Sequence, residues 1–268
     1  MKIKIFNEDC FETMKRMQHY NTKVDIILTS PPYNTGRPSN SERSRNNNEG
    51  RYDVYLDTMT AKEYRQWCVD MFDEFDSILN QNGIVLWQVS YGNDASVNTE
   101  SIGLMWGTLS DIIDNTNFTI ADRIVWKKSN ALPNNVSKNK LTRITEDVYV
   151  FCRKNEFKTF NANKPISKVG KNGQTFYQNI FNFIEAPNND GKCDLNKATY
   201  SSSLCKQLLN IYALPNAKVY DPFMGTGTTA VACKELGLTC YGSEISEAQC
   251  EWAKNRIGEP CTIWSNNK

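Results

Sequence analysis

Histidine is almost absent from this 268-residue chain, which contains only His19. A catalytic triad or a histidine-rich metal centre needs an imidazole among partners, so the scarcity disfavours both, and we expect His19 to be an ordinary surface residue. There are nine cysteines, but no two of them are spaced as C-x-x-C, and a zinc site or disulfide framework would need clustered spacing. We therefore expect free thiols in a reducing compartment and no metal site.

Long apolar runs are also missing. The densest apolar stretch, residues 83–89, is far shorter than the ~20 residues that a membrane-spanning helix needs. Residues 1–9 turn polar too early to form a secretory signal. With 40% hydrophobic and 23% charged residues, the composition is typical of a globular protein, and we expect it in the cytoplasm with no membrane partner. The length fits one large domain, or one domain that carries an insertion.

Charge is nearly balanced overall, at +1, but it is unevenly distributed. Residues 121–175 hold twelve Lys or Arg against four acidic residues. A basic third on an otherwise neutral body is typical of a face that binds a polyanion, although a solvated lysine-rich surface would give the same count.

Strand and helix patterns alternate along most of the chain. We expect strands at residues 2–6, 24–29, 84–90, 118–126, 147–152, 217–220 and 239–242, and helices at 11–17, 60–82, 102–113, 202–212, up to 236, and 246–257. This alternation predicts an α/β fold with a doubly wound, mainly parallel sheet. We divide the chain into a first half of the sheet (1–126), a basic insertion (127–198), a second half of the sheet (199–261) and a polar tail (262–268).

A glycine-rich turn joins the strand at 217–220 to the next helix and reads D-P-F-M-G-T-G-T-T from Asp221. Glycines let the backbone approach a ligand, and a helix N-terminus offers free N–H groups. No lysine follows, as a phosphate loop would require, and a structural tight turn remains an alternative. Glu244 ends the next strand, where an acid commonly accepts hydrogen bonds from ribose hydroxyls, so a nucleoside ligand is favoured.

A second turn, T-S-P-P-Y-N from Thr29, ends the strand at 24–29. Ligands of doubly wound sheets bind outside the carboxyl ends of strands, so this turn and the glycine-rich turn can share one cleft. The turn suits a flat ring that carries an amino group: Tyr33 would stack on it, while Ser30 Oγ and the Pro31 carbonyl would accept the amino hydrogens. The alternative is a proline-stiffened turn with Tyr33 in the core.

Together the two motifs, S-P-P-Y and D-P-F-M-G-T-G, resemble those of the DNA methyltransferases that use S-adenosylmethionine to methylate exocyclic amino groups of adenine or cytosine. The order of tetrapeptide, basic insertion and cofactor loop looks like the beta arrangement of that family. The resemblance extends over about residues 7–256. Residues 146–154 also match a strand that the family places behind the target pocket, whereas residues 197–201 read K-A-T-Y-S where the family often has a histidine.

The resemblance implies a role for each motif residue. The tetrapeptide Ser30, Pro31, Pro32 and Tyr33 would bind the target base. The cofactor S-adenosylmethionine would be bound by Asp9, Cys10, Asp221, Phe223, Gly225, Thr226, Gly227, Thr228 and Glu244.

The expected partner is double-stranded DNA from which the base is flipped, at a cost of a few kcal/mol that stacking on Tyr33 could offset. Basic side chains would contact its phosphates; the candidates are Arg37, Arg43, Arg45, Arg51, Lys127, Lys128, Lys138, Lys140 and Arg143. A cognate restriction endonuclease, as in a restriction-modification system, and a second copy of the chain are further partners that the sequence leaves open.

The target base is not decided by chemistry, because cytosine and adenine both present an amino group beside a ring nitrogen. In the family, Ser at the first position of the tetrapeptide is common for cytosine N4 and Asp for adenine N6, so we favour cytosine N4 over adenine N6. Two other classes remain open. An RNA methyltransferase usually has Asn at that position, and a catalytically silent DNA-binding module would not need both motifs.

Overall fold

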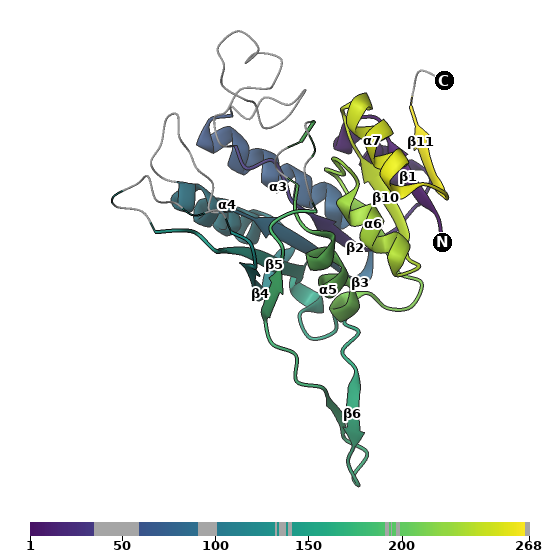
Figure 1. Ribbon diagram of the computed structural model, residues 1–268. Helices are drawn as coiled ribbons and strands as arrows, with labels where there is room; N and C mark the ends of the chain where they lie inside the picture. Colours follow the sequence, from purple (N-terminus) through teal and green to yellow (C-terminus); the bar gives the residue numbers. More distant parts are fainter. Residues whose placement is uncertain are drawn as a thin grey trace.

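The chain folds around one nine-stranded sheet (Figure 1). The computed structural model describes residues 1–34, 59–90, 101–131, 133, 138, 141–190, 193, 195–196 and 199–265. The strands are β1 (Ile3–Phe6), β2 (Val24–Thr29), β3 (Leu79–Val89), β4 (Phe118–Lys128), β5 (Thr145–Arg153), β8 (Phe183–Ala186), β9 (Lys218–Asp221), β10 (Thr239–Ser243) and β11 (Cys261–Trp264). They lie in the order β11-β1-β10-β9-β2-β3-β5-β4-β8.

All neighbouring strands from β11 to β3 are parallel, while β5 runs antiparallel to both β3 and β4. The parallel strands β1, β2, β9 and β10 therefore end at the same edge of the sheet. Because β5 is reversed, the start of β5 and the end of β4 lie at that edge too. The expected α/β fold with a mainly parallel sheet is confirmed.

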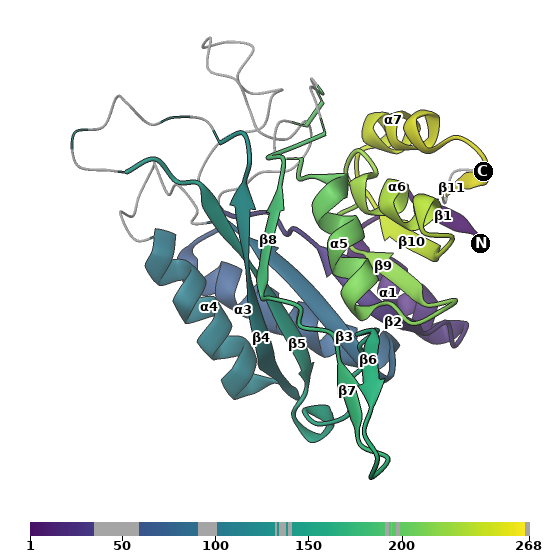
Figure 2. The ribbon, with the colours of Figure 1, turned by 60° about the horizontal axis from the view of Figure 1, so that its bottom comes forward.

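Helices cover both faces of the sheet (Figure 2). On one face lie α1 (Cys10–His19), α3 (Ala61–Ile78) and α4 (Ser101–Asn115), and on the other α5 (Ser202–Tyr212), α6 (Thr228–Glu235) and α7 (Glu247–Ile257). Alternate residues of each strand serve the two layers: Ile84 and Leu86 pack with α5 to α7, whereas Val85 and Trp87 pack with α1, α3 and α4. This alternation is what a strand buried on both faces requires.

Residues 127–198, expected to be an insertion, are only in part separate from the sheet. β5 lies inside the sheet and β8 forms its edge beside β4. Between them, β6 (Ile166–Val169) and β7 (Thr175–Tyr177) form an antiparallel hairpin that extends away from the body in both ribbon views. Lys154–Glu156 form one short 3-10 helix after β5.

The prediction of a polar tail at residues 262–268 is wrong for residues 262–264, which belong to a strand. Residues 261–264 form β11, which pairs in parallel with β1, and the Trp264 ring lies 5.8 Å from that of Phe6. The guanidinium of Arg16 stacks 3.7 Å from the centroid of Trp264. Four residues are too few to show a clear strand pattern in the sequence, and this segment forms a strand because it pairs with β1.

Candidate functional site

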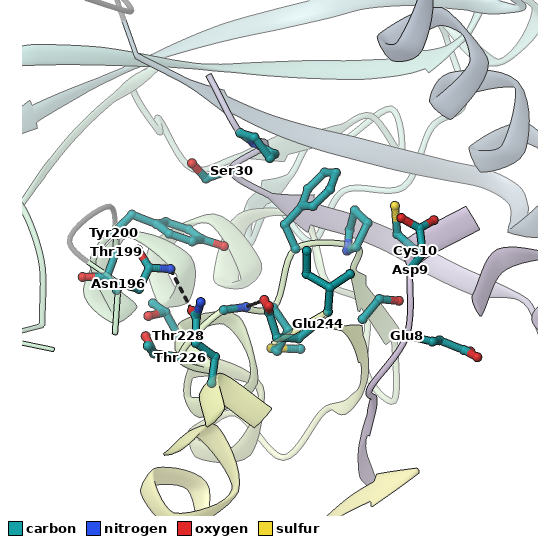
Figure 3. A pocket seen from close by; sticks show the side chains of 18 of the residues that line it. Glu8, Asp9, Cys10, Ser30, Asn196, Thr199, Tyr200, Thr226, Thr228 and Glu244 are labelled. Carbon is teal, nitrogen blue, oxygen red and sulfur yellow. Dashed lines mark hydrogen bonds between the residues drawn. The ribbon is translucent and has the colours of Figure 1, made fainter. Parts of the chain in front are cut away.

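One pocket of about 240 Å³ lies at the carboxyl edge of the parallel strands (Figure 3). It is lined by residues that follow β1, β2, β9 and β10, which are far apart in sequence. The predicted site residues in its wall are Asp9, Cys10, Ser30, Pro32, Phe223, Gly225, Thr226, Thr228 and Glu244. In the close-up, Ser30 lies on one side, Thr226 and Thr228 on another, and Glu8, Asp9 and Cys10 on a third. The tetrapeptide turn and the glycine-rich turn thus meet in one pocket.

The glycine-rich turn takes a conformation that needs glycine at two positions. Gly225 and Gly227 have φ of +52° and +84°, in the left-handed region that side chains disfavour. Gly227 is the N-cap of α6, and a Cβ there would lie 2.9 Å from the Cβ of Ala253 on α7. Gly227 therefore acts from behind the pocket, by letting α6 begin directly against α7.

Asp221 lies under the pocket and not in its wall, with 1% of its surface exposed. Its Oδ1 accepts hydrogen bonds from Thr29 Oγ1 at 2.7 Å and from the Phe223 amide at 3.0 Å, and its Oδ2 accepts one from Thr229 Oγ1 at 2.5 Å. Burial raises the pKa of Asp221 above its ordinary value, although these hydrogen bonds act in the opposite direction. The carboxylate ties the end of β2, next to Ser30, to the turn after β9.

Glu244 joins the glycine-rich turn to the start of α7. Its Oε2 accepts a hydrogen bond from the Gly225 amide at 2.8 Å, and its Oε1 accepts one from the Ser246 amide at 2.9 Å. Asn7 donates to the Glu244 carbonyl at 2.9 Å. The side chain is half-buried and lines the pocket, so its carboxylate presents an acceptor to a ligand there.

Asp9 and Cys10 begin α1 on the far side of the pocket. Asp9 is the exposed N-cap, and its Oδ1 accepts from the Phe11 amide at 2.8 Å. Cys10 is buried, and burial raises the pKa of its thiol, which therefore stays protonated at neutral pH. Cys10 therefore offers no thiolate nucleophile to the pocket.

The tetrapeptide is held rigidly by its neighbours. Pro31 and Pro32 are buried, and Tyr64 OH on α3 donates to the Pro32 carbonyl at 2.7 Å. Tyr33 OH lies 2.6 Å from Ser30 Oγ and donates to Gln88 Oε1, also at 2.6 Å. Tyr33 lines a second cavity of about 30 Å³, beside the pocket that Ser30 lines.

Several residues of the pocket were not predicted from the sequence. Trp67 of α3 reaches the pocket and its ring lies 5.6 Å from that of Phe223. Asn196 and Thr199 close the opposite side, where Asn196 Nδ2 donates to Gln249 Oε1 at 3.0 Å (Figure 3). In the sequence, Trp67 is one of several regularly spaced apolar residues on one helix face, so nothing distinguished it as a pocket residue. For the wall formed by Asn196 and Thr199, the one signal in the sequence was that residues 197–201 differ from the family pattern.

The basic candidates for DNA contact are dispersed. Lys138 and Arg143 are exposed, whereas Lys127 pairs with Glu185 at 2.9 Å and Lys128 pairs with Glu146 at 2.6 Å. The remaining candidates, Arg37, Arg43, Arg45, Arg51 and Lys140, lie outside the described residues.

Metal-binding geometry is not found in the part of the chain that the structure describes, where no group of three His, Cys, Asp or Glu side chains comes together. His19 is exposed. In the same part, no helix has the length and apolar character needed to cross a membrane.

Known proteins are similar to this chain in sequence and in fold. The chain matches the family model N6_N4_Mtase, described as DNA methylase, over residues 24–255. It is 25% identical over 275 residues to the type II methyltransferase M.BglII of Bacillus subtilis, covering 96% of this chain and 69% of that protein. It is also 25% identical over 263 residues to M.HinfI of Haemophilus influenzae, covering 95% and 68%.

Three solved structures share the fold. The crystal structure of M1.HpyAVI gives a TM-score of 0.62 at 24% identity, covering 96% of this chain and 98% of that one. The M1.HpyAVI complex with SAM gives 0.59 at 22%, covering 96% and 99%. The cytosine-N4-specific PvuII DNA methyltransferase gives 0.66 at 15%, covering 98% and 89%.

Proposed function

The chain belongs to the N6_N4_Mtase family of DNA methylases, and from that premise we propose that its pocket binds S-adenosylmethionine while Ser30 binds the amino group to be methylated. The observation that carries this proposal is that Ser30 and Pro32 line the same pocket as Gly225 and Thr228. A methyl donor and an acceptor amino group must come within bonding distance, and one shared pocket provides for that.

The residues of the pocket fit such a cofactor. Phe223, Pro222 and Ile245 supply apolar surface for a ring, and the Glu244 carboxylate supplies an acceptor for ribose hydroxyls. Gly225 leaves room for close approach, since a Cβ there would lie only 3.1 Å from Asn196 Nδ2. The SAM complex of M1.HpyAVI, whose fold this chain shares, supports the same assignment. When bound, the cofactor supplies a methyl group that is already activated by its sulfonium.

The protein then has to position a poor nucleophile. The lone pair of the target amino group is delocalised into the base, and hydrogen bonds from that group to Ser30 Oγ and the Pro31 carbonyl would favour a pyramidal nitrogen. In-line positioning can supply ~7 to 11 kcal/mol, so no histidine base is needed. The buried Asp221 and the Tyr64 bond to Pro32 hold the turn in place. Tyr33 is proposed to contact the flipped base from its position beside Ser30.

For the target base we propose cytosine N4. Ser30 at the first position of the tetrapeptide supports cytosine, as does the likeness in fold to the cytosine-N4-specific PvuII enzyme. Adenine N6 is the second candidate, since both bases present an amino donor to the same acceptors.

For DNA contact we propose the β6–β7 hairpin together with Lys138 and Arg143. Residues 163–181 contain three lysines and no acidic residue, and Lys168 Nζ lies 5.1 Å from the Phe176 ring centroid. The curated relatives are type II methyltransferases, which supports a cognate restriction endonuclease as a functional partner. Whether the chain forms a homodimer is tested by sedimentation of the purified protein with and without DNA.

The direct test uses methyl-labelled S-adenosylmethionine, the purified chain and a mixed-sequence duplex, followed by digestion to nucleosides and mass analysis. We expect N4-methylcytosine, and N6-methyladenine would overturn the choice of base. The Ser30→Ala, Tyr33→Ala double variant should still bind DNA but transfer no methyl group. Transfer at the wild-type rate by that variant would overturn the assignment of the tetrapeptide.

A further inference from the structure

A line of hydrogen bonds leads from Ser30 away from the pocket, across the sheet edge, to Lys128. Ser30 Oγ lies 2.6 Å from Tyr33 OH, which donates to Gln88 Oε1 at 2.6 Å. Gln88 Nε2 donates to Glu146 Oε2 at 2.8 Å, and Lys128 Nζ donates to Glu146 Oε1 at 2.6 Å. Gln88 is fully buried. Glu146 and Lys128 have side chains that are only 13% and 15% exposed.

The direction of every bond in this line follows from its far end. An ionised carboxylate has no proton, so Glu146 can only accept. Gln88 must therefore turn its amide nitrogen toward Glu146 and its carbonyl oxygen toward Tyr33. The carbonyl oxygen can only accept, so Tyr33 donates its one proton to Gln88. Tyr33 then accepts from Ser30, and the hydroxyl proton of Ser30 points away from the pocket.

We infer that Gln88 and Glu146 are positioning residues that make Ser30 a pure hydrogen-bond acceptor toward the target base. This inference rests on the proposed function and deepens it. A serine hydroxyl by itself can donate or accept, and so would bind an amino or a keto group. With its proton committed to Tyr33, Ser30 Oγ offers only lone pairs, which attract an amino group and repel a keto oxygen.

The consequence is selection among flipped bases. Cytosine and adenine present an amino group at this position, and uracil and hypoxanthine present a keto oxygen in its place. A Ser30 that can only accept binds the first pair in preference to the second. The line thereby achieves with a serine what a carboxylate at the same position would achieve directly.

Lys128 has a defined part in this arrangement. Its ammonium can only donate, and it also lies 5.2 Å from the ring centroid of Trp126, which holds it beside Glu146. In a Glu146→Gln variant, Lys128 would still demand an acceptor, so the new amide would turn its oxygen to Lys128 and its nitrogen to Gln88. Gln88 would then rotate, Tyr33 would donate to Ser30, and the Ser30 proton would point into the pocket.

The test is a measurement of base preference in Glu146→Gln. Once wild-type protein has been used to map the methylated site, two duplexes are prepared, one with the natural amino base and one with its keto counterpart, uracil for cytosine or hypoxanthine for adenine. The ratio of the two dissociation constants, with S-adenosylhomocysteine present, is compared between proteins. We expect the variant to shift this ratio roughly ten-fold or more toward the keto base. In the variant the Ser30 hydroxyl would donate a hydrogen bond to the keto oxygen, which the lone pairs of wild-type Ser30 repel.

Two further variants make the outcome decisive. Gln88→Leu breaks the line and should bring the ratio toward one without inverting it. Glu235→Gln removes the Glu235–Lys206 pair, which has the same 2.6 Å separation but lies on α5 and α6, and should leave the ratio unchanged. Thermal melting checks that each variant is folded.

The possible failures can be told apart. If wild-type protein transfers no methyl group to any DNA, the proposed function is overturned, and base selection by Ser30 with it. If wild-type protein methylates DNA but Glu146→Gln keeps the wild-type ratio, the proposed function stands and the inference about Gln88 and Glu146 is overturned. A purely structural role of Glu146 would lower the melting temperature and leave the ratio as it is.

Discussion

Replacement of Asp221 separates the two things that this carboxylate does, which are to hold the turns together and to shape the pocket. Asp221→Ala leaves the Thr29 hydroxyl, the Thr229 hydroxyl and the Phe223 amide without their acceptor. At ~1 to 3 kcal/mol for each buried group left unsatisfied, the free energy of unfolding should fall by about 3 kcal/mol or more. For a chain of this size that corresponds to a decrease in Tm of roughly 6 °C or more.

Asp221→Asn should cost much less. The amide can keep its oxygen toward Thr29 and the Phe223 amide and turn its nitrogen toward Thr229, whose hydroxyl can accept. We expect a loss of about 1 kcal/mol, equivalent to one hydrogen bond. Calorimetry should show that S-adenosylmethionine binds to Asp221→Asn with near wild-type affinity and to Asp221→Ala at least ten-fold more weakly.

Asp25 provides the control, because it ties the same two strands together at their other end. Its Oδ2 accepts from the Lys218 amide at 2.8 Å and its Oδ1 from Asn80 at 2.7 Å. Asp25→Ala should lower the Tm but leave cofactor affinity unchanged. Wild-type affinity in Asp221→Ala, or equal damage by Asn and Ala, would refute this account of Asp221.

The pH dependence of the same pair of proteins gives an independent check. Burial raises the pKa of Asp221 above the ordinary value of 3.8. A carboxyl whose pKa rises on folding contributes stability that is fully present below its unfolded value and is lost as pH rises through its folded value. Asparagine cannot ionise, so the deficit of Asp221→Asn relative to wild type should shrink between pH 4 and pH 8 in urea denaturation. A deficit that grows over this range would show that the hydrogen bonds outweigh the cost of burial.

Three further predictions follow from the structure. Gly227→Ala should lower the Tm by several degrees and more than Gly237→Ala, because both have positive φ but only the Cβ at Gly227 would meet a neighbour within 4 Å; equal effects would contradict the α6–α7 contact. Glu244→Gln should weaken binding of S-adenosylmethionine roughly ten-fold in calorimetry while the protein stays folded, and unchanged affinity would remove Glu244 from the cofactor site. Three lysines in and beside the hairpin can be replaced by Ala, namely Lys164, Lys168 and Lys171. Each replacement of a lysine that contacts a phosphate should reduce the slope of log affinity for DNA against log salt by about 1, and an unchanged slope would exclude the hairpin from DNA contact.

The sequence predicted the regular part of the fold because local signals and packing agree there. The strand at 24–29 and the helix at 202–212 have the predicted bounds, and the predicted Thr60 capping box is formed. The reversal of β5 could not be predicted, because a strand buried on both faces has the same pattern in either direction. β11 was missed because four residues beside a polar end give no periodicity, and only β1 provides their hydrogen bonds.

The site was predictable where a motif carries the chemistry itself. Both turns were identified from proline and glycine, whose backbone preferences can be seen in a sequence. The contributions of Trp67, Asn196 and Glu146 were not, because each depends on where another element packs. Lys128 shows the limit most clearly: its charge suggested DNA contact, while its position beside Glu146 gives it a partner within the protein.

Photolabelling with methyl-labelled S-adenosylmethionine tests most directly whether the two turns share one pocket. After ultraviolet irradiation and digestion with trypsin, we predict label in residues 24–43, which contain Ser30, and in residues 219–234, which contain Gly225, with both signals removed by excess unlabelled cofactor. Competable label confined to other peptides, with neither turn modified, would contradict it.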